Sequence, residues 1–393
     1  MNGYNMLELT FRDILRSINP LNDDWSIRFH IITEIRAIVE SIESLRGATV
    51  EPFGSFASNL FTRWGDLDIS IEVQNGSYIS CPGKKHKQSL LGDVLRALRK
   101  KGSFRRLQFI SNARVPILKL ESNYNISIDI SINNLSGQMK SKILFWINEI
   151  DGRFRDMVKE WAKAHHINDS KSGTLNSYSL SLLVVFHLQT LVPAILPPLK
   201  DIYPGNMMDD LTGVRAVAEK HIEDTCAVNI NRIKSNKSRL INRSSLSVLF
   251  ISFLAKVEDP FEQPANTARS VSSYQLRRIS EAIQATYGLL ASANQNQASL
   301  VSVLVGPHVS RIMTRTYMPP PIINQLTSRT PVSNHSRNGH KTAGPERKPT
   351  SVHSQQQSQK KRTDKHPNGT TKVPVNASTS HKQQVWRPRS EVD

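Results

Sequence analysis

The pair Gly54-Ser55, followed after ten residues by two aspartates, Asp66 and Asp68, constrains this chain more than any other feature. Gly54 and Ser55 follow a short apolar stretch that suits a strand, and they let the backbone turn tightly into a helix start. The N–H groups and the dipole of a helix start bind phosphate. The next strand alternates with period two, which places Asp66 and Asp68 on one face and apolar side chains on the other. Two carboxylates beside a phosphate cradle predict half of a two-metal site, which activates an attacking hydroxyl and stabilises a departing pyrophosphate. The alternative is a solvated strand face.

A third acidic ligand is expected from a neighbouring strand. The segment Asn125–Ile132 alternates, with four isoleucines on one face and Asp129 between two serines on the other. A carboxylate in so apolar a strand is costly unless it is solvated, paired or bound to metal. Asp129 is therefore the candidate third ligand, and an aspartate on the wet face of an edge strand is the alternative. Pro116, in the strand signal before it, indicates an edge or a bulge.

These residues carry a family resemblance. The set Gly-Ser, Asp-x-Asp and Asp resembles the nucleotidyltransferase superfamily that includes DNA polymerase beta. The chain is more specifically similar to terminal uridylyltransferases and non-canonical poly(A) polymerases, and closest to the plant enzymes that uridylate small RNAs. The matching segments are Leu45–Val50, Ser58–Leu60, Asp129–Asn134, Val158–Lys163, Asn176–Leu180 and Glu258–Glu262.

The resemblance implies an α+β fold with four parts. Residues 1–45 are expected to form helices that pack on a helical domain, and residues 46–145 a mixed-sheet catalytic domain. Residues 146–318 are expected to form a shortened helical nucleotide-recognition domain, the poly(A)-polymerase-associated domain. Residues 319–393 are predicted to be a disordered basic tail. Periodicity predicts helices over 24–45, 87–101, 154–166, 176–191, 211–233 and 244–255.

The resemblance also assigns nucleotide-binding residues. Lys159 and Lys163 are four apart on one helix face, so both can reach one triphosphate, although a surface lysine pair is the alternative. Ser177 corresponds to a triphosphate-contacting serine, and Tyr178 to a base-stacking tyrosine whose alternative is a role in the core. The remaining positions belong to a recognition loop and comprise Asp259, Glu262 and Arg269.

Three departures from the family pattern leave alternatives open. Ala265 stands where uridine-specific relatives carry a histidine, an apolar helical turn before Lys159 is missing, and only Val257 remains of a longer segment before Glu258. The resemblance implies that the chain is an RNA 3′-terminal uridylyltransferase. A catalytically impaired, shortened RNA-binding form and an adenylate-adding enzyme are the alternatives.

Charge and composition favour a polyanionic partner. The 393 residues carry a net charge of +18, and 13 Lys and Arg against 4 acidic residues lie from Pro319 onward. Only two cysteines are present, and no signal peptide or bilayer-spanning apolar run is evident, which predicts an intracellular protein without a membrane partner. The expected partners are an RNA 3′ end, UTP or ATP, Mg²⁺ or Mn²⁺, and a small-RNA effector protein. The protein is expected to be a monomer in the nucleus or cytoplasm, where its activity promotes RNA turnover.

Overall fold

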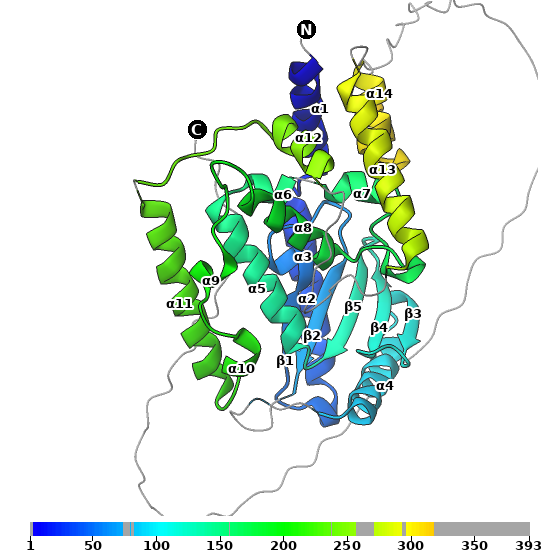
Figure 1. Cartoon of the computed structure of the whole chain (residues 1–393). Helices are drawn as coiled ribbons and strands as arrows, with labels where there is room; N and C mark the ends of the chain where they lie inside the picture. The colour runs from blue at the N-terminus through cyan, green and yellow to red at the C-terminus, as the bar shows by residue number, and fades with distance from the viewer. Residues whose placement is uncertain are drawn as a thin grey trace, which may run out of the picture. The chain divides into compact units, whose positions relative to one another are not determined.

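A five-stranded mixed sheet forms the centre of the structure, which is a computed structural model (Figure 1). The structure describes residues 3–73, 79, 82–156, 158–236, 238–256, 271–292 and 296–317, all within one unit of the chain, Met1–Pro319. The strand order is β1-β2-β5-β4-β3. Only the β2–β5 pair is parallel; the other pairs are antiparallel. The strands are β1 (Thr49–Phe53), β2 (Leu67–Glu72), β3 (Phe104–Ile110), β4 (Ile117–Ser122) and β5 (Ser127–Ile132).

Helices account for most of the remaining described residues, which confirms the α+β class. Their bounds are α1 (Gly3–Ile18), α2 (Asn22–Glu40), η1 (Glu43–Leu45), α3 (Gly54–Ala57), α4 (Lys84–Lys101), α5 (Leu135–Ile150), α6 (Arg153–Asp156), α7 (Lys159–Ala164), η2 (Ser170–Ser172), α8 (Ser177–Gln189), α9 (Leu199–Ile202), α10 (Met207–Asp210), α11 (Arg215–Ser235), α12 (Leu246–Lys256), α13 (Ser273–Ala291), α14 (Gln297–Leu304) and α15 (Pro307–Tyr317). No helix among the described residues is both long and apolar enough to cross a bilayer.

One hydrophobic cluster, the sheet core, lies between the sheet and helices α2 and α4. The inward residues of β2 and β5 are β-branched or leucine, and Ile69, Ile71, Ile128 and Ile130 are fully buried. Such residues favour strands because they pack well on a pleated surface. The sheet core fixes the register of β2 and β5, and with it the positions of the acidic residues on both strands.

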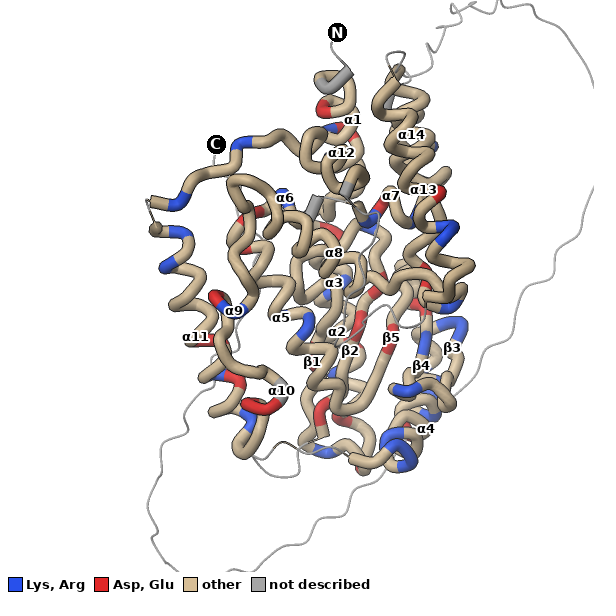
Figure 2. Tube along the Cα trace, in the orientation of Figure 1, with Lys and Arg blue, Asp and Glu red and all other residues tan. Residues whose placement is uncertain are grey.

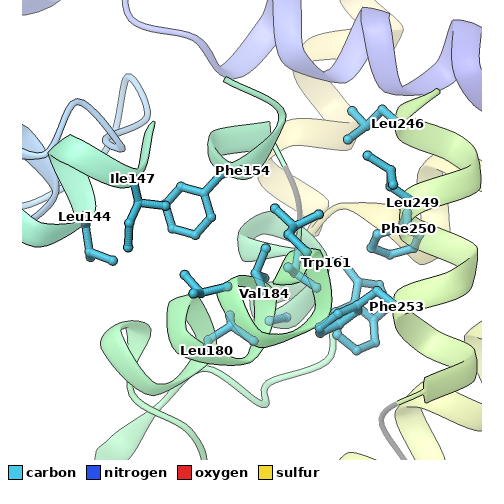
Figure 3. Close-up of a cluster of buried hydrophobic side chains, with 14 of the residues drawn as sticks. Leu144, Ile147, Phe154, Trp161, Leu180, Val184, Leu246, Leu249, Phe250 and Phe253 are labelled. Carbon is cyan, nitrogen blue, oxygen red and sulfur yellow. The ribbon is translucent and has the colours of Figure 1, made fainter. Parts of the chain in front are cut away.

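A second cluster, the helical core, joins α1 with α5–α8, α11 and the later helices. Figure 3 shows its centre, where Trp161 of α7 lies among side chains of α8 and α12. The Trp161 ring packs edge-on against Phe250, with centroids 5.8 Å apart, and its N–H donates to Thr286 Oγ1 at 3.0 Å. Because Trp161 is buried and hydrogen-bonded, it anchors α7, the helix that carries both predicted phosphate-binding lysines.

Two local expectations are wrong. The helix expected over 154–166 is divided into α6 and α7, and between them Val158 has φ +59°, a conformation that β-branched residues rarely adopt. The two N-terminal helices were both expected on the helical domain. Helix α1 does pack in the helical core, but α2 packs on the sheet, through Ile31, Ile35 and Ile38. Its periodicity showed a buried face without showing which partner buries it.

Candidate functional site

Two of the three predicted aspartates lie on paired strands. Asp68 of β2 and Asp129 of β5 are direct partners in the parallel pairing, and Asp66 lies immediately before β2. The positions of β2 and β5 that carry acidic residues lie near one another in Figure 2. Asp66 is exposed, whereas Asp68 and Asp129 are half-buried. The structure thus brings the predicted carboxylates to the same end of two neighbouring strands.

Burial and mutual repulsion make this end of the sheet unfavourable for negative charge. Desolvation, with the charges of Asp129 and Asp66, raises the pKa of Asp68 to about 7. Partial desolvation and the charge of Asp129 also raise the pKa of Asp66. A bound cation would relieve both effects, because an opposite charge favours the ionised carboxylate.

Asp129 has a cationic partner that sequence reasoning missed. Lys119 of β4 is its direct partner across the antiparallel β4–β5 pair, and the Lys119 Nζ lies 2.6 Å and 2.8 Å from the two carboxylate oxygens. Lys119 alternates with buried Leu118 and Leu120, and this period could have identified it as a residue on the polar face of the sheet.

The donor chemistry of the three aspartates suits a hard divalent cation, since Mg²⁺ and Mn²⁺ take carboxylate oxygens. Within the described residues, however, no three acidic, histidine or cysteine side chains are gathered closely enough to hold an ion as they stand. The ion pair between Lys119 and Asp129 occupies one of the carboxylates. Ion binding would therefore compete with Lys119 for Asp129.

Gly54 lies against Asp68. Its φ is +69°, and a Cβ at this position would lie 1.9 Å from the Asp68 Oδ2, so glycine is required for both conformation and space. The Gly54 N–H is already bonded: it donates to the Ser141 Oγ of α5 at 2.7 Å. Ser55, in the short helix α3, is half-buried and its carbonyl accepts from the Leu60 N–H at 2.8 Å. The turn thus brings its backbone close to the carboxylates, with α5 behind it.

The two predicted lysines lie on α7 near the aspartates. Burial, with the charge of Lys163, lowers the pKa of Lys159 to about 8, and the Lys159 Nζ lies 3.5 Å from the Leu60 carbonyl oxygen. Lys163 is more exposed and pairs with Glu160 at 2.6 Å. The charges of both lysines act to lower the pKa of Asp66. They are therefore close enough to the carboxylates to interact with them.

Ser177 and Tyr178 begin α8, which Asn176 caps by accepting from the Ser179 N–H at 2.8 Å. Ser177 is exposed and donates to the Asn168 Oδ1 at 3.2 Å. Burial raises the pKa of Tyr178, and the Lys140 Nζ lies 5.0 Å from the centre of its ring. Asp259, Glu262, Arg269 and Ala265 lie outside the described residues.

A buried ion pair joins the strand of the aspartates to the helices. Glu72 of β2 is 3% exposed and pairs with Arg215 of α11. Gln138 of α5 donates to Glu72 at 2.5 Å and accepts from Arg215 at 2.8 Å. Nothing in the sequence pattern paired these residues, because their contact depends on how α11 packs on α5.

A family model described as the central palm domain of mitochondrial-like poly(A) RNA polymerase matches residues 7–149. Protein HESO1 of Arabidopsis thaliana is 51% identical over 357 residues, which cover 80% of this chain and 70% of that protein. Poly(A) RNA polymerase cid11 of Schizosaccharomyces pombe is 28% identical, over 51% of this chain and 42% of its own length.

Solved structures share the fold. The Cid1 poly(U) polymerase with MgGTP bound matches with a TM-score of 0.58 at 20% identity, over 76% of this chain and 98% of Cid1. The structure of mtPAP in complex with UTP matches with a TM-score of 0.58 at 18% identity, over 78% of this chain and 72% of that one. With the identity to HESO1, these findings show that the chain belongs to the family of terminal uridylyltransferases and non-canonical poly(A) polymerases, which are RNA nucleotidyltransferases.

Proposed function

We propose that this protein adds uridines to RNA 3′ ends without a template. The observation that carries the proposal is the direct pairing of Asp68 with Asp129 on parallel strands, next to Gly54. The 51% identity to HESO1 and the fold shared with the Cid1 poly(U) polymerase support uridine as the added nucleotide.

In the proposed reaction, the RNA 3′-hydroxyl loses its proton to solvent, and its oxygen forms a bond to the α-phosphorus of UTP. The bond from that phosphorus to the bridging oxygen breaks, and pyrophosphate leaves with the electron pair. Asp66, Asp68 and Asp129 would hold Mg²⁺ or Mn²⁺, which supplies charge stabilisation for the attacking and leaving oxygens. Their oxygen donors and the raised pKa values of Asp66 and Asp68 support this assignment.

The other site residues bind and orient the nucleotide. Lys159 and Lys163 contact the triphosphate, which offsets its charge, and Ser177 donates a hydrogen bond to it. The Tyr178 ring stacks on the base, and Lys140 must leave that ring first if it occupies the same face. Asp259, Glu262 and Arg269 complete the recognition loop. Gly54 and Ser55 bring the backbone of the turn close to the phosphates.

The substrates we propose are small RNAs, delivered by an effector protein in the nucleus or cytoplasm, and uridylation then promotes their turnover. The protein acts as a monomer. The net charge of +18 supports an RNA partner, because phosphate binding releases counterions.

The test is extension of a labelled small RNA by purified protein, with each ribonucleotide in turn and with Mg²⁺ or Mn²⁺. A ladder with UTP, abolished by Asp66→Ala and by EDTA, supports the proposal. A ladder favouring ATP would instead support the adenylate-adding alternative. No extension with any nucleotide, together with no binding of UTP, would support the catalytically impaired form.

A further inference from the structure

An exposed tryptophan lies two residues before the first aspartate of the candidate site. Trp64 is 39% exposed and is separated from Asp66 by Gly65 alone. Two residues of extended chain span about 7 Å, so the base of the Trp64 side chain begins within one nucleotide's length of the carboxylates. A single exposed apolar side chain needs no explanation by itself. The position of this one, beside a site that acts on RNA, gives it a chemical context.

Hydrogen bonds fix the backbone of the turn that carries Trp64. The guanidinium of fully buried Arg28 donates to the carbonyl oxygen of Arg63 at 3.1 Å and to that of Gly65 at 2.7 Å, on both sides of the tryptophan. The Gly65 N–H donates to the Thr62 carbonyl at 2.7 Å. With its backbone fixed on both sides, the turn presents the indole ring in a defined position.

A second ring, that of His308, and a cation, Arg63, lie beside the Trp64 ring. His308 of α15 meets the Trp64 ring edge-on, with centroids 4.7 Å apart and an angle of 88° between the planes. The guanidinium carbon of Arg63 lies 6.0 Å from the centre of the Trp64 ring. Arg63 is itself held by Asp24 at 3.2 Å. Side chains from two distant parts of the chain thus form an aromatic surface with a positive charge beside it.

We propose that Trp64, supported by His308, is the platform on which the 3′-terminal base of the RNA stacks. Aromatic stacking is tolerant of sequence because every base has a π-face. Such a contact suits an acceptor whose terminal base changes from the original nucleotide to uridine after one addition. Lys159 and Tyr178, which we assign to the nucleotide, lie in the first turns of α7 and α8, whereas Trp64 precedes β2, and we assign Trp64 to the acceptor. The inference rests on the proposed function, since it assigns a subsite for the RNA of that reaction.

The experiment measures RNA and UTP separately. Trp64→Leu should raise the Kd for RNA by about 5- to 100-fold, the usual range for one stacked base, and leave the KM for UTP unchanged. Trp64→Phe should keep most of the affinity, and His308→Ala should lose a smaller part. Tyr287→Leu is the matched control, because Tyr287 on α13 is 40% exposed and lies far from Asp66 in sequence. This variant should bind RNA as the unaltered protein does.

The position on the RNA is tested with 2-aminopurine, whose fluorescence falls when it stacks. Placed at the 3′ terminus it should be quenched by the unaltered protein and by Trp64→Phe, but not by Trp64→Leu. When 2-aminopurine is placed several nucleotides upstream, its fluorescence should be the same with all three proteins. An RNA Kd for Trp64→Leu within twofold of the unaltered value, or a rise in the KM for UTP without a rise in the RNA Kd, would overturn the inference. If the unaltered protein binds RNA but extends it with no nucleotide, the proposed function fails while the quenching still decides the stacking.

Discussion

Lys119 and Asp129 face each other across β4 and β5; the Lys119 Nζ donates to the Asp129 Oδ2 at 2.8 Å and lies 2.6 Å from the Oδ1 in the same ion pair. The lysine charge also acts to lower the pKa of Asp66 and of Asp68. Lys119 thus partly neutralises three carboxylates, of which it contacts one.

Lys119→Met should shift the acidic limb of the pH–rate profile to higher pH. Without the lysine charge Asp66 and Asp68 bind protons more tightly, so the pKa values of these two carboxyls rise and their ionised, metal-binding form appears later as pH increases. The measurement is kcat/KM for UTP against pH. Lys119→Arg keeps the charge and is the control. An acidic limb at the same pH in both variants would show that Lys119 does not act on the site through its charge.

Asp68→Asn should stabilise the metal-free protein at pH 8. The pKa of Asp68 is raised from 3.8 to about 7, so its ionised form is disfavoured in the folded state, and stability falls as pH rises from about 4 to about 7. The variant lacks this penalty, which is on the order of 2 kcal/mol after allowance for solvent at a half-buried group.

The check is chemical denaturation in EDTA at pH 4 and pH 8. The difference between the two proteins should appear at pH 8 and be small at pH 4. Adding Mg²⁺ at pH 8 should stabilise the unaltered protein more than the variant. If Asp68→Asn is no more stable than the unaltered protein at pH 8, burial and neighbouring charges do not destabilise the ionised Asp68 carboxylate.

Gly54→Ala should lower the rate of uridine addition by about 100-fold or more, because the new methyl would collide with the Asp68 carboxylate. Gly102→Ala is a matched control: Gly102 has φ +73°, close to the +69° of Gly54, but nothing lies within 4 Å of its Cβ position. Both variants should lose about 1 kcal/mol of stability from backbone strain, and only Gly54→Ala should lose uridine addition. Equal loss of activity in the two would assign the effect to folding alone.

Arg215→Met should destabilise the protein by about 3 kcal/mol, because it leaves the buried Glu72 carboxylate without its ion partner. Lys234→Met removes a more exposed partner, that of Glu149, and should cost less than about 1 kcal/mol. Urea denaturation at neutral pH measures both. The double variant Arg215→Met with Glu72→Gln should recover part of the loss, and failure to recover any would mean that the arginine acts through packing.

Removing the residues beyond Met318 should weaken RNA binding without changing its sequence preference, since phosphate contacts carry no base information. This segment holds 13 Lys and Arg against 4 acidic residues from Pro319 onward. If it binds about five phosphates of single-stranded RNA, the slope of log affinity against log salt should fall by roughly 3–4. Binding of the full and shortened chains at several salt concentrations gives the slopes, and parallel lines of equal affinity would show that the segment does not contact RNA.

Local patterns predicted the strands of the site because alternation needs only neighbouring residues. The period of two identified the polar faces that carry Asp68 and Asp129. It did not identify their direct pairing or the approach of Lys119, which follow from the β2–β5–β4 strand order and so from contacts distant in sequence.

In the helix expected over 154–166, the local pattern is helical but contacts distant in sequence override it. Its residues have a helical period, yet Val158 adopts a positive φ between α6 and α7. Phe154 and Trp161, on the two sides of this residue, are both buried in the helical core (Figure 3). Packing of these two rings outweighs the local preference of the backbone, which sequence propensity does not include.

The packing of α1 has a consequence for synthesis. Its buried side chains, Leu7, Phe11, Ile14 and Ile18, belong to the same core as Phe250 and Leu304, and Phe11 packs edge-on against Phe250 with centroids 5.1 Å apart. The sheet core is complete once Ile132 has left the ribosome, but α1 must wait for α12–α15. At roughly 5–20 residues per second that interval lasts on the order of ten to forty seconds. During it α1 is without the later helices that bury its apolar face, and an uncovered apolar face on a nascent chain is prone to aggregation.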